Sequence, residues 1–491
     1  MPQKNSTNGW GWKNIKPIHE VIMNNPSLIE TISVTVNPYD QNLLSANINI
    51  SSTVSLKFSY IVNGKTSDVD FTYSSEVFTT NPVIPVIGLY ANTINEIDVV
   101  VEDLSGNKET TTVYADTTGQ DYGDVALNIN IEILDETIAK TSINNGWLMT
   151  SYFNGYDKNG DIRITGLYQW GTTPLKTHDG SIIAGDNIFG YYYATTLYAI
   201  NLLGKVNKTI NAPDGFGFHH DVTWDSTGNI FVLATMLEDQ TDSNKLESIV
   251  AKIDATTGEI IWSVDYSEQF YNSDVLANSD TNDVHINTID YIEKLDQIII
   301  NSRSTCTIFA ISPDDGEIIW MIDNPANEVL DESKNLTAIN DFIYPNGEHA
   351  VFLTDNTKYD NYSGDNQLVL SVFNNNSCLN DDGTDNVRKM ESPKDDDYYA
   401  APVDSQAVIL GIDLTARTVE RLDTFAVTGE RSELRGSVFQ NGDNYDVFFC
   451  DAYDFFTLDT NNTIGVRALD IETVTSYRAR IFSYDELRAL I

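Results

Sequence analysis

The segments IDATTGEIIWSVD (residues 253–265) and ISPDDGEIIWMID (residues 311–323) are close copies of each other. Each reads as a β-strand, a tight acidic turn that contains glycine, and a second β-strand rich in Ile and Trp. LYAINLLGKV (residues 197–206) and ILGIDLTARTV (residues 409–419) are diverged relatives of the same pattern. One strand-turn-strand unit that recurs along the chain indicates a repeat architecture built of β-hairpins.

The repeat region extends from residue 118 to residue 491, a length that fits about six four-stranded units of roughly 60 residues each. Six such units predict a β-propeller, whose inner strands line a central channel. Side chains from distant parts of the sequence can then meet at one point. An elongated β-solenoid would also produce repeats, but its stacked units would not bring distant residues together.

A smaller β-domain is predicted ahead of the repeats, over residues 31–117. Its segments ISVTVNP, SANINI, VSLKFSYIV, DVDFTY, INEIDVVVED and ETTTVYAD alternate polar and apolar residues and are separated by turn residues. Residues 1–30 are predicted to form a tail with a short helix at IHEVIMNN (residues 18–25). The predicted fold is therefore all-β: a small N-terminal β-sandwich followed by a six-bladed β-propeller over residues 118–491.

The charge of the chain limits its partners. The sequence has 491 residues, with 72 acidic against 29 basic side chains and a formal net charge of -43. Such a surface repels phosphate backbones and anionic lipids, so we expect neither nucleic acid nor membrane partners. The N-terminus lacks the apolar run of a secretory signal, which predicts a cytoplasmic protein; a periplasmic or secreted location is the alternative if a leader has been removed.

No metal or cofactor is expected. Cys306, Cys378 and Cys450 have neither metal-ligand spacing nor the density of a disulfide scaffold, although one pair could bridge. DKNGDI (residues 157–162) resembles part of a calcium loop but lacks the later glutamate, so a plain turn is predicted. The HHD triplet has no further ligands at a recognised spacing, and no phosphate-binding loop is present.

The candidate functional residues lie in two neighbouring β-type runs. In VHINTI (residues 284–289) strand alternation places His285 and Asn287 on one face, and in IIINSRST (residues 298–305) it does the same for Asn301 and Arg303. A short turn makes the two runs a hairpin. An imidazole and a guanidinium could then bind one small anion, since the donors of arginine match the oxygens of a sulfate, phosphate or carboxylate.

Two further segments add histidines. In GFGFHHDV (residues 215–222) alternation would let only one of His219 and His220 face the channel, with Asp221 orienting that imidazole. His349 follows a turn and opens a strand in NGEHAVFLTDN (residues 346–356). A single histidine is more often a packing residue than a catalyst, which is our expectation for His19 and His178. Histidines on three successive strands beside one arginine instead favour a site, because a buried polar cluster without a ligand is costly.

These residues carry a resemblance to a known family. HHDV, DVHINTIDYI, DQIIINSRST, IFAISPDDGEIIW and EHAVFLTDN resemble the bacterial arylsulfate sulfotransferases that do not use the nucleotide sulfate donor. ISVTVNPYDQNLLSA and NPVIPVIGLYANTINEIDV resemble that family's N-terminal β-domain. The likeness spans roughly residues 30–490, and its most specific part is the H-x-N…S-x-R portion.

The resemblance implies a six-bladed propeller that moves a sulfuryl group from a phenolic sulfate ester to another phenol. It implies a sulfohistidine intermediate, ping-pong kinetics and a homodimer. His349 would be the nucleophile. The residues implied to bind the sulfuryl oxygens are His285, Asn287, Arg303 and one of His219 and His220, with His220 preferred, and Ser437 of GSVFQ would add a late hydroxyl.

Two other functions compete with this reading. A propeller without catalytic activity could bind an anionic or phenolic ligand, or a protein partner. The TGEIIW repeats also fit a quinoprotein-type dehydrogenase, which would bind a quinone and calcium. The three histidine-bearing strands argue against the dehydrogenase.

Overall fold

The structure, a computed structural model, describes residues 27–165, 174–186, 193–237, 247–271, 284–323, 331–376, 404–432, 434–469, 471 and 476–491. The helix predicted over residues 18–25, His19 and Cys378 lie outside these ranges. Among the described residues, Cys306 and Cys450 are not joined to each other by a disulfide.

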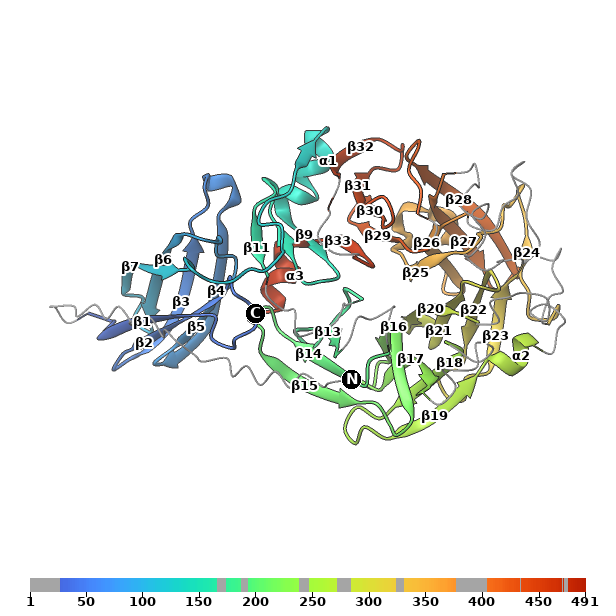
Figure 1. Ribbon diagram of the computed structural model, residues 1–491, viewed down its shortest axis with the longest axis horizontal. Helices are drawn as coiled ribbons and strands as arrows, with labels where there is room; N and C mark the ends of the chain where they lie inside the picture. The colour runs from blue at the N-terminus through green and yellow to red at the C-terminus, as the bar shows by residue number, and fades with distance from the viewer. Residues whose placement is uncertain are drawn as a thin grey trace, which may run out of the picture.

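The N-terminal part of the chain is a β-sandwich of two antiparallel sheets, as predicted (Figure 1). One sheet contains β1 (Thr31–Val36), β2 (Ala46–Ser51) and β5 (Val83–Val86). The other contains β4 (Phe71–Thr80), β3 (Ser55–Val62), β6 (Ile94–Asp103) and β7 (Lys108–Asp116). Along β6 the buried side chains of Ile97, Val99 and Val101 alternate with more exposed neighbours, because successive residues of a strand point to opposite faces. The domain boundaries at residues 30 and 117 stay predictions.

The remaining strands form six sheets arranged in a ring, which confirms the six-bladed propeller (Figure 1). The blades are numbered along the chain, and the strands of each are given from the inner strand outward. Blade 1 contains β33 (Ala479–Ser483), β9 (Gly146–Thr150), β10 (Gly155–Tyr156) and β11 (Ile162–Ile164), and blade 2 contains β12 (Thr177–His178), β13 (Ser181–Gly185), β14 (Thr196–Ile200) and β15 (Val206–Asn211). Blade 3 contains β16 (Phe216–Trp224), β17 (Ile230–Met236), β18 (Ile249–Ile253) and β19 (Ile260–Asp265). Blade 4 contains β20 (Ile286–Ile292), β21 (Gln297–Ser302), β22 (Thr307–Ile311) and β23 (Ile318–Ile322). Blade 5 contains β25 (His349–Leu353), β26 (Gln367–Asn374), β27 (Gln406–Asp413), β28 (Thr418–Ala426) and β24 (Thr337–Ala338). Blade 6 contains β29 (Ser437–Asn441), β30 (Asn444–Phe449), β31 (Asp454–Leu458), β32 (Ile464–Ala468) and β8 (Ile131–Ile133).

The sequence repeats are the outer hairpins of the blades. The two close copies form β18–β19 of blade 3 and β22–β23 of blade 4, and the diverged relatives form β14–β15 and β27–β28. Their turns depend on glycine, since Gly258 and Gly316 have φ of +76° and +75°. The repeats therefore identify the periphery of each blade, while the channel is lined by the inner strands.

The ring is closed by strands from both ends of the propeller. The C-terminal strand β33 pairs with β9 as the inner strand of blade 1, and β8 pairs with β32 at the outer edge of blade 6. Closure leaves the first and last blades no freedom to separate without breaking a strand ladder. It also places residues just before β33 at the centre of the ring.

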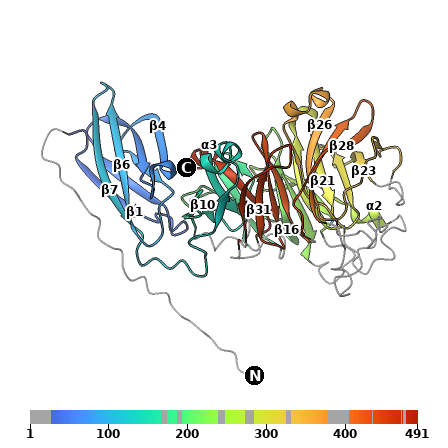
Figure 2. The same ribbon diagram turned by 90° about the horizontal axis from the view of Figure 1, so that it is seen from above.

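The sandwich lies beside the ring, next to blade 1, in both views (Figures 1 and 2). The C-terminal helix α3 (Tyr484–Ala489) connects the two parts, because Arg488 donates hydrogen bonds to the carbonyl and hydroxyl oxygens of Thr72. Asp157 forms an ion pair of 2.8 Å with buried Arg163, whose Nε donates to the carbonyl oxygen of Gly88 in the N-terminal sandwich and so supports the same junction. The other α-helices are α1 (Glu136–Lys140) and α2 (Ser267–Tyr271). None of the helices in the described ranges is long and apolar enough to cross a bilayer.

Candidate active site

Three neighbouring inner strands, β16, β20 and β25, each carry an irregularity at a histidine. Their registers shift between His219 and Val222, between Ile286 and Thr288, and between His349 and Phe352. Beside these shifts φ is positive: +53° at His220, +49° at His285 and +51° at Ala350. A bulge redirects side chains, and left-handed backbone at residues other than glycine costs free energy that the surrounding structure must offset. The same strain in three successive blades points to function.

His219 and His220 both belong to the site, so the expectation that only one of them could face the channel is wrong. Their Nδ1 atoms lie 2.9 Å apart, and their rings meet edge to face with centroids 5.1 Å apart. Both side chains are buried. Strict alternation fails here because the left-handed backbone of His220 turns its side chain back toward that of His219.

The other predicted residues join this pair in one cluster. The His285 ring centroid is 5.0 Å from that of His220, and the Tyr477 ring lies 5.6 Å from His220 and 6.3 Å from His349. The backbone N–H of Arg303 donates to the carbonyl oxygen of His285 at 3.0 Å, so the predicted hairpin neighbours are confirmed. We call His219, His220, His285 and His349 the histidine cluster.

The hydrogen bonds of Asn375 determine the tautomer of His349. Its Nδ2 donates to the carbonyl oxygens of Ser432 and Arg435, at 2.6 and 2.9 Å. Its Oδ1 is therefore left to accept, and His349 Nδ1 lies 2.8 Å from it. Since Nδ1 must carry the proton, Nε2 carries a lone pair. Nε2 is buried and has no hydrogen-bond partner among the described residues.

The surroundings keep two of the imidazoles neutral. Burial, followed by the positive charge of Arg303, holds the pKa of His349 well below its usual value. Burial also lowers the pKa of His220, against the opposing effect of the Glu247 charge. A neutral imidazole with a directed lone pair is a competent nucleophile at neutral pH.

Arg303 presents a pair of donors to the site. The residue is 7% exposed, and its Nε and Nη2 have no hydrogen-bond partner among the described residues. These two nitrogens form one edge of the guanidinium, whose parallel N–H groups match two oxygens of a tetrahedral anion. Buried polar groups are normally hydrogen-bonded, so this edge is suited to a ligand.

Asn287 holds the backbone that carries His349. The Nδ2 atoms of Asn287 and Asn301 both donate to the carbonyl oxygen of Glu348, at 3.0 and 2.7 Å, and Asn301 Nδ2 lies 2.8 Å from Asn287 Oδ1. These bonds tie blade 4 to blade 5 at the peptide preceding His349. The sulfuryl-binding role that the resemblance implies for Asn287 stays a prediction.

Asp221 has other partners than an imidazole, which corrects its expected role. Its Oδ1 accepts from the backbone of Val222, and its Oδ2 accepts from the backbone of Ile289. The same Oδ2 lies 3.2 Å from both Arg478 Nη2 and Lys176 Nζ. Asp221 therefore anchors buried cations beneath the site and joins the inner strands to the chain just before β33.

Ser437 and His178 lie in other contacts. The Ser437 hydroxyl is 3.4 Å from both the carbonyl oxygen and the backbone nitrogen of Ala479, so it joins blade 6 to blade 1. Its catalytic role stays a prediction. His178 stacks on Trp224 at 4.6 Å, in the structural role expected for it.

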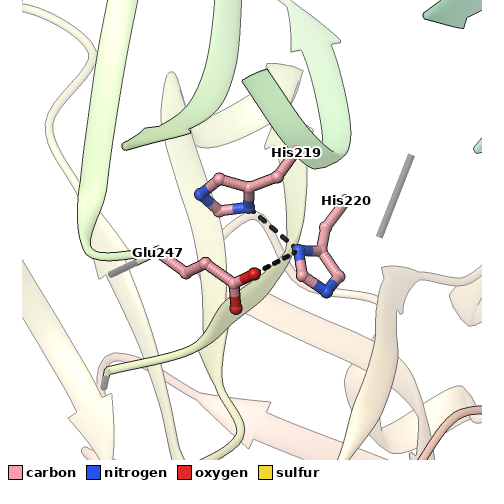
Figure 3. Close-up of side chains that lie close together, drawn as sticks. All are labelled: His219, His220 and Glu247. Atoms are coloured by element: carbon pink, nitrogen blue, oxygen red, sulfur yellow. Dashed lines mark hydrogen bonds and ion pairs between the residues drawn. The ribbon is translucent and has the colours of Figure 1, made fainter. Parts of the chain in front are cut away.

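Three residues of the site were missed from the sequence. Asn375 follows β26 in a run of asparagines. Tyr477 lies just before β33, the strand that closes the ring, and the polar residues beside it could have marked it as a candidate site residue. Glu247 lies two residues before the start of β18, and its carboxylate points toward the His219–His220 pair (Figure 3). No spacing rule connects any of them to the histidines, because the ring brings them together.

Among the residues that the structure describes, His219, His220 and Glu247 form a group that could hold a metal ion. Their potential ligand atoms all lie within 4.8 Å of one another. The two imidazole Nδ1 atoms are already hydrogen-bonded to each other, however, and Glu247 Oε2 lies only 2.7 Å from His285 Nδ1. These contacts suit proton sharing within the histidine cluster.

Comparison with known families decides the identity. The arylsulfotransferase (ASST) family model matches residues 124–476, and the arylsulfotransferase Ig-like domain model matches residues 33–119. The chain belongs to the arylsulfotransferase family. Membership confirms the resemblance and shows aryl sulfotransferase activity in general for this arylsulfotransferase. No curated protein matches it in sequence.

Several solved structures resemble the arylsulfotransferase only distantly. A protein of unknown function from Bacteroides caccae has 8% identity and a TM-score of 0.35, covering 87% of this chain and 99% of its own. A putative 6-phosphogluconolactonase from Bacteroides fragilis has 11% identity and a TM-score of 0.37, covering 87% and 98%. An auxiliary nutrient binding protein from Bacteroides thetaiotaomicron has 10% identity and a TM-score of 0.34, covering 92% and 98%. Similarity at this level carries no conclusion about the arylsulfotransferase.

Proposed function

We propose that this arylsulfotransferase moves a sulfuryl group from a phenolic sulfate ester to another phenol by way of a sulfohistidine at His349. The observation that carries the proposal is the state of Nε2 of His349. Asn375 directs the single ring proton to Nδ1, and burial with the charge of Arg303 keeps the ring neutral. The lone pair is thus on the one ring nitrogen without a partner among the described residues.

The reaction takes two steps. In the first, the Nε2 lone pair of His349 forms an N–S bond with the donor, the ester S–O bond breaks, and a phenolate leaves. In the second, an acceptor phenol oxygen forms a new S–O bond as the N–S bond breaks. A covalent intermediate that divides the reaction in this way gives ping-pong kinetics.

Arg303 is proposed to stabilise the transferring group. Sulfuryl transfer resembles phosphoryl transfer, in which negative charge is spread over the peripheral oxygens and fixed donors supply much of the rate enhancement. The overall charge of -43 would repel an anionic donor, so a buried guanidinium is needed at the point of reaction. His285, Asn287 and the His219–His220 pair complete the proposed binding site.

The experiment is to mix the protein with 4-nitrophenyl sulfate alone, quench it rapidly and search its peptides by mass spectrometry. We expect one added sulfuryl group on the peptide that contains His349. Later addition of phenol should remove this group and yield phenyl sulfate. A sulfuryl group on another residue would reassign the nucleophile, whereas no adduct and no nitrophenol release would favour the non-catalytic binding propeller.

Replacing Asn375 should alter the pH dependence of transfer. In Asn375→Leu the Nδ1–H group of His349 loses its closer acceptor and keeps only the carbonyl oxygen of Gly347, at 3.1 Å, so the ring is held less firmly and we expect kcat to fall by about 10- to 100-fold. In Asn375→Asp the added negative charge favours the imidazolium form, which must lose its proton before it attacks. The acidic limb of the kcat/KM profile should then move to higher pH. Profiles that move equally in both variants would contradict this role.

Homodimerisation and a cytoplasmic location complete the proposal. Homodimerisation rests on the family resemblance, and sedimentation at several protein concentrations tests it. Location can be followed by fractionation of producing cells.

A further inference from the structure

Glu247 places a carboxylate inside a site proposed to bind anions. Its side chain is only 13% exposed, and its backbone is held in the left-handed region at φ +56°. The carbonyl oxygen of Glu247 accepts from the backbone N–H of Ile286 at 2.9 Å, which links blade 3 to blade 4. An unpaired carboxylate would repel sulfuryl oxygens. A strained backbone that positions such a group indicates a specific use.

The partner of this carboxylate is His285. Glu247 Oε2 lies 2.7 Å from His285 Nδ1, while Oε1 is 4.0 Å from His220 Nδ1. Burial would raise the pKa of Glu247, but the charge of His285 and its contact with the carboxylate are the main effects that oppose burial, and the pKa is held below its usual value. An ionised carboxylate in contact with an imidazole favours the protonated ring.

The other groups around the cluster leave this proton to His285. His220 and His349 are kept neutral, as shown above. Burial raises the pKa of Glu348 well above its usual value, which disfavours a negative charge there, and burial also raises the pKa of Tyr477, which therefore stays protonated at neutral pH.

Two of the described arginines also act on this region through their charge. The arginine beneath the cluster, Arg478, is paired with Asp221, whereas Arg303 keeps an unpaired edge for the substrate. His219 shares its Nδ1 contact with His220. Within the described part of the site, the close ion pair is therefore the one between Glu247 and His285.

We propose that Glu247 and His285 form the proton-carrying pair of this arylsulfotransferase, with His285 as general acid and base and Glu247 as its positioning residue. This inference rests on the proposed function. In the first step, His285 gives its Nε2 proton to the phenolate oxygen as the ester S–O bond breaks. In the second step, the acceptor phenol returns a proton to Nε2 as its oxygen bonds to sulfur. Glu247 stays ionised throughout and holds Nδ1, so the protons and charges balance over the cycle.

The pair should matter most for poor leaving groups. A nitrophenolate is weakly basic and leaves readily without being protonated. The more basic phenolate leaves readily only if its oxygen receives a proton at the transition state. A positioned general acid is worth about 10²- to 10⁴-fold where it is required. Sulfate donors whose leaving phenolates differ in basicity therefore distinguish a loss of proton transfer from a general weakening of the site.

The test compares Glu247→Gln with the wild type on 4-nitrophenyl sulfate and phenyl sulfate. The amide retains the size of the side chain but not its charge. We expect kcat/KM to fall by less than about tenfold for 4-nitrophenyl sulfate and by about 100-fold or more for phenyl sulfate. The alkaline limb of the phenyl sulfate profile should move to lower pH, because protonated His285 is the active form.

Glu348→Gln is the matched control. Its side chain is also a buried carboxyl near the site, but burial raises its pKa well above the usual value and its carboxyl makes no hydrogen bond to His285 among the described residues, so the ratio of kcat/KM between the two donors should stay as in the wild type. Equal losses for both donors in Glu247→Gln would overturn the pair, as would one equivalent of metal in the wild type that Glu247→Gln lacks. Failure of the wild type to form a sulfuryl adduct at His349 would instead overturn the proposed function.

Discussion

His349→Asn is expected to lower sulfuryl transfer by about 10⁴-fold or more, because it removes the atom that forms the covalent intermediate. The replacement amide can still donate to Asn375 Oδ1, so the local hydrogen bonding at the end of β26 is retained. The lost feature is the imidazole Nε2, which is buried and has no partner among the described residues. Burst release of nitrophenol and the sulfuryl adduct should disappear together.

Two measurements make this result specific. His178→Asn changes a histidine that stacks on Trp224 away from the cluster, and it should leave transfer unchanged. Thermal unfolding of His349→Asn should remain cooperative, which separates loss of chemistry from loss of fold. Substantial activity in His349→Asn, with a sulfuryl group carried by another side chain, would contradict the assignment.

The architecture could be predicted because its signals are local. Each outer hairpin repeats a strand, an acidic glycine turn and a strand, and four copies were visible in the sequence. Alternating segments likewise predicted the sandwich strands from β1 to β7, apart from β5. These patterns depend on neighbouring residues in the chain, so reading them requires no knowledge of how the ring closes.

The site was predicted in its residue types but not in its geometry. Alternation assumes a regular strand, and it failed at His220, whose backbone is left-handed. Such bulges are stabilised by contacts from other blades, as when Glu247 bonds to Ile286. Asp221 follows His220 in the sequence and was expected to orient an imidazole, but its carboxylate instead pairs with buried Arg478, which lies just before the C-terminal strand β33. Pairings set by ring closure leave no local pattern.

Arg303→Met is expected to lower kcat/KM by about 10³-fold, because the two parallel donors, Nε–H and Nη2–H, that would bind two sulfuryl oxygens are lost. Arg303→Lys is the matched variant: an ammonium keeps the charge but not the parallel donors, so we expect a smaller loss of about 100-fold. Both variants should retain the hairpin contact with His285, which is made by the backbone.

The two arginine variants should also separate charge from geometry in their pH profiles. Burial and then the charge of Arg303 hold the pKa of His349 well below its usual value. A neutral residue at position 303 removes the second effect, so the pKa of His349 rises and a larger share of the nucleophile is protonated at mildly acidic pH. The acidic limb of kcat/KM should therefore move to higher pH in Arg303→Met and stay in place in Arg303→Lys. Unmoved limbs in both variants, together with equal losses of rate, would show that Arg303 neither tunes His349 nor binds the sulfuryl group through its parallel donors.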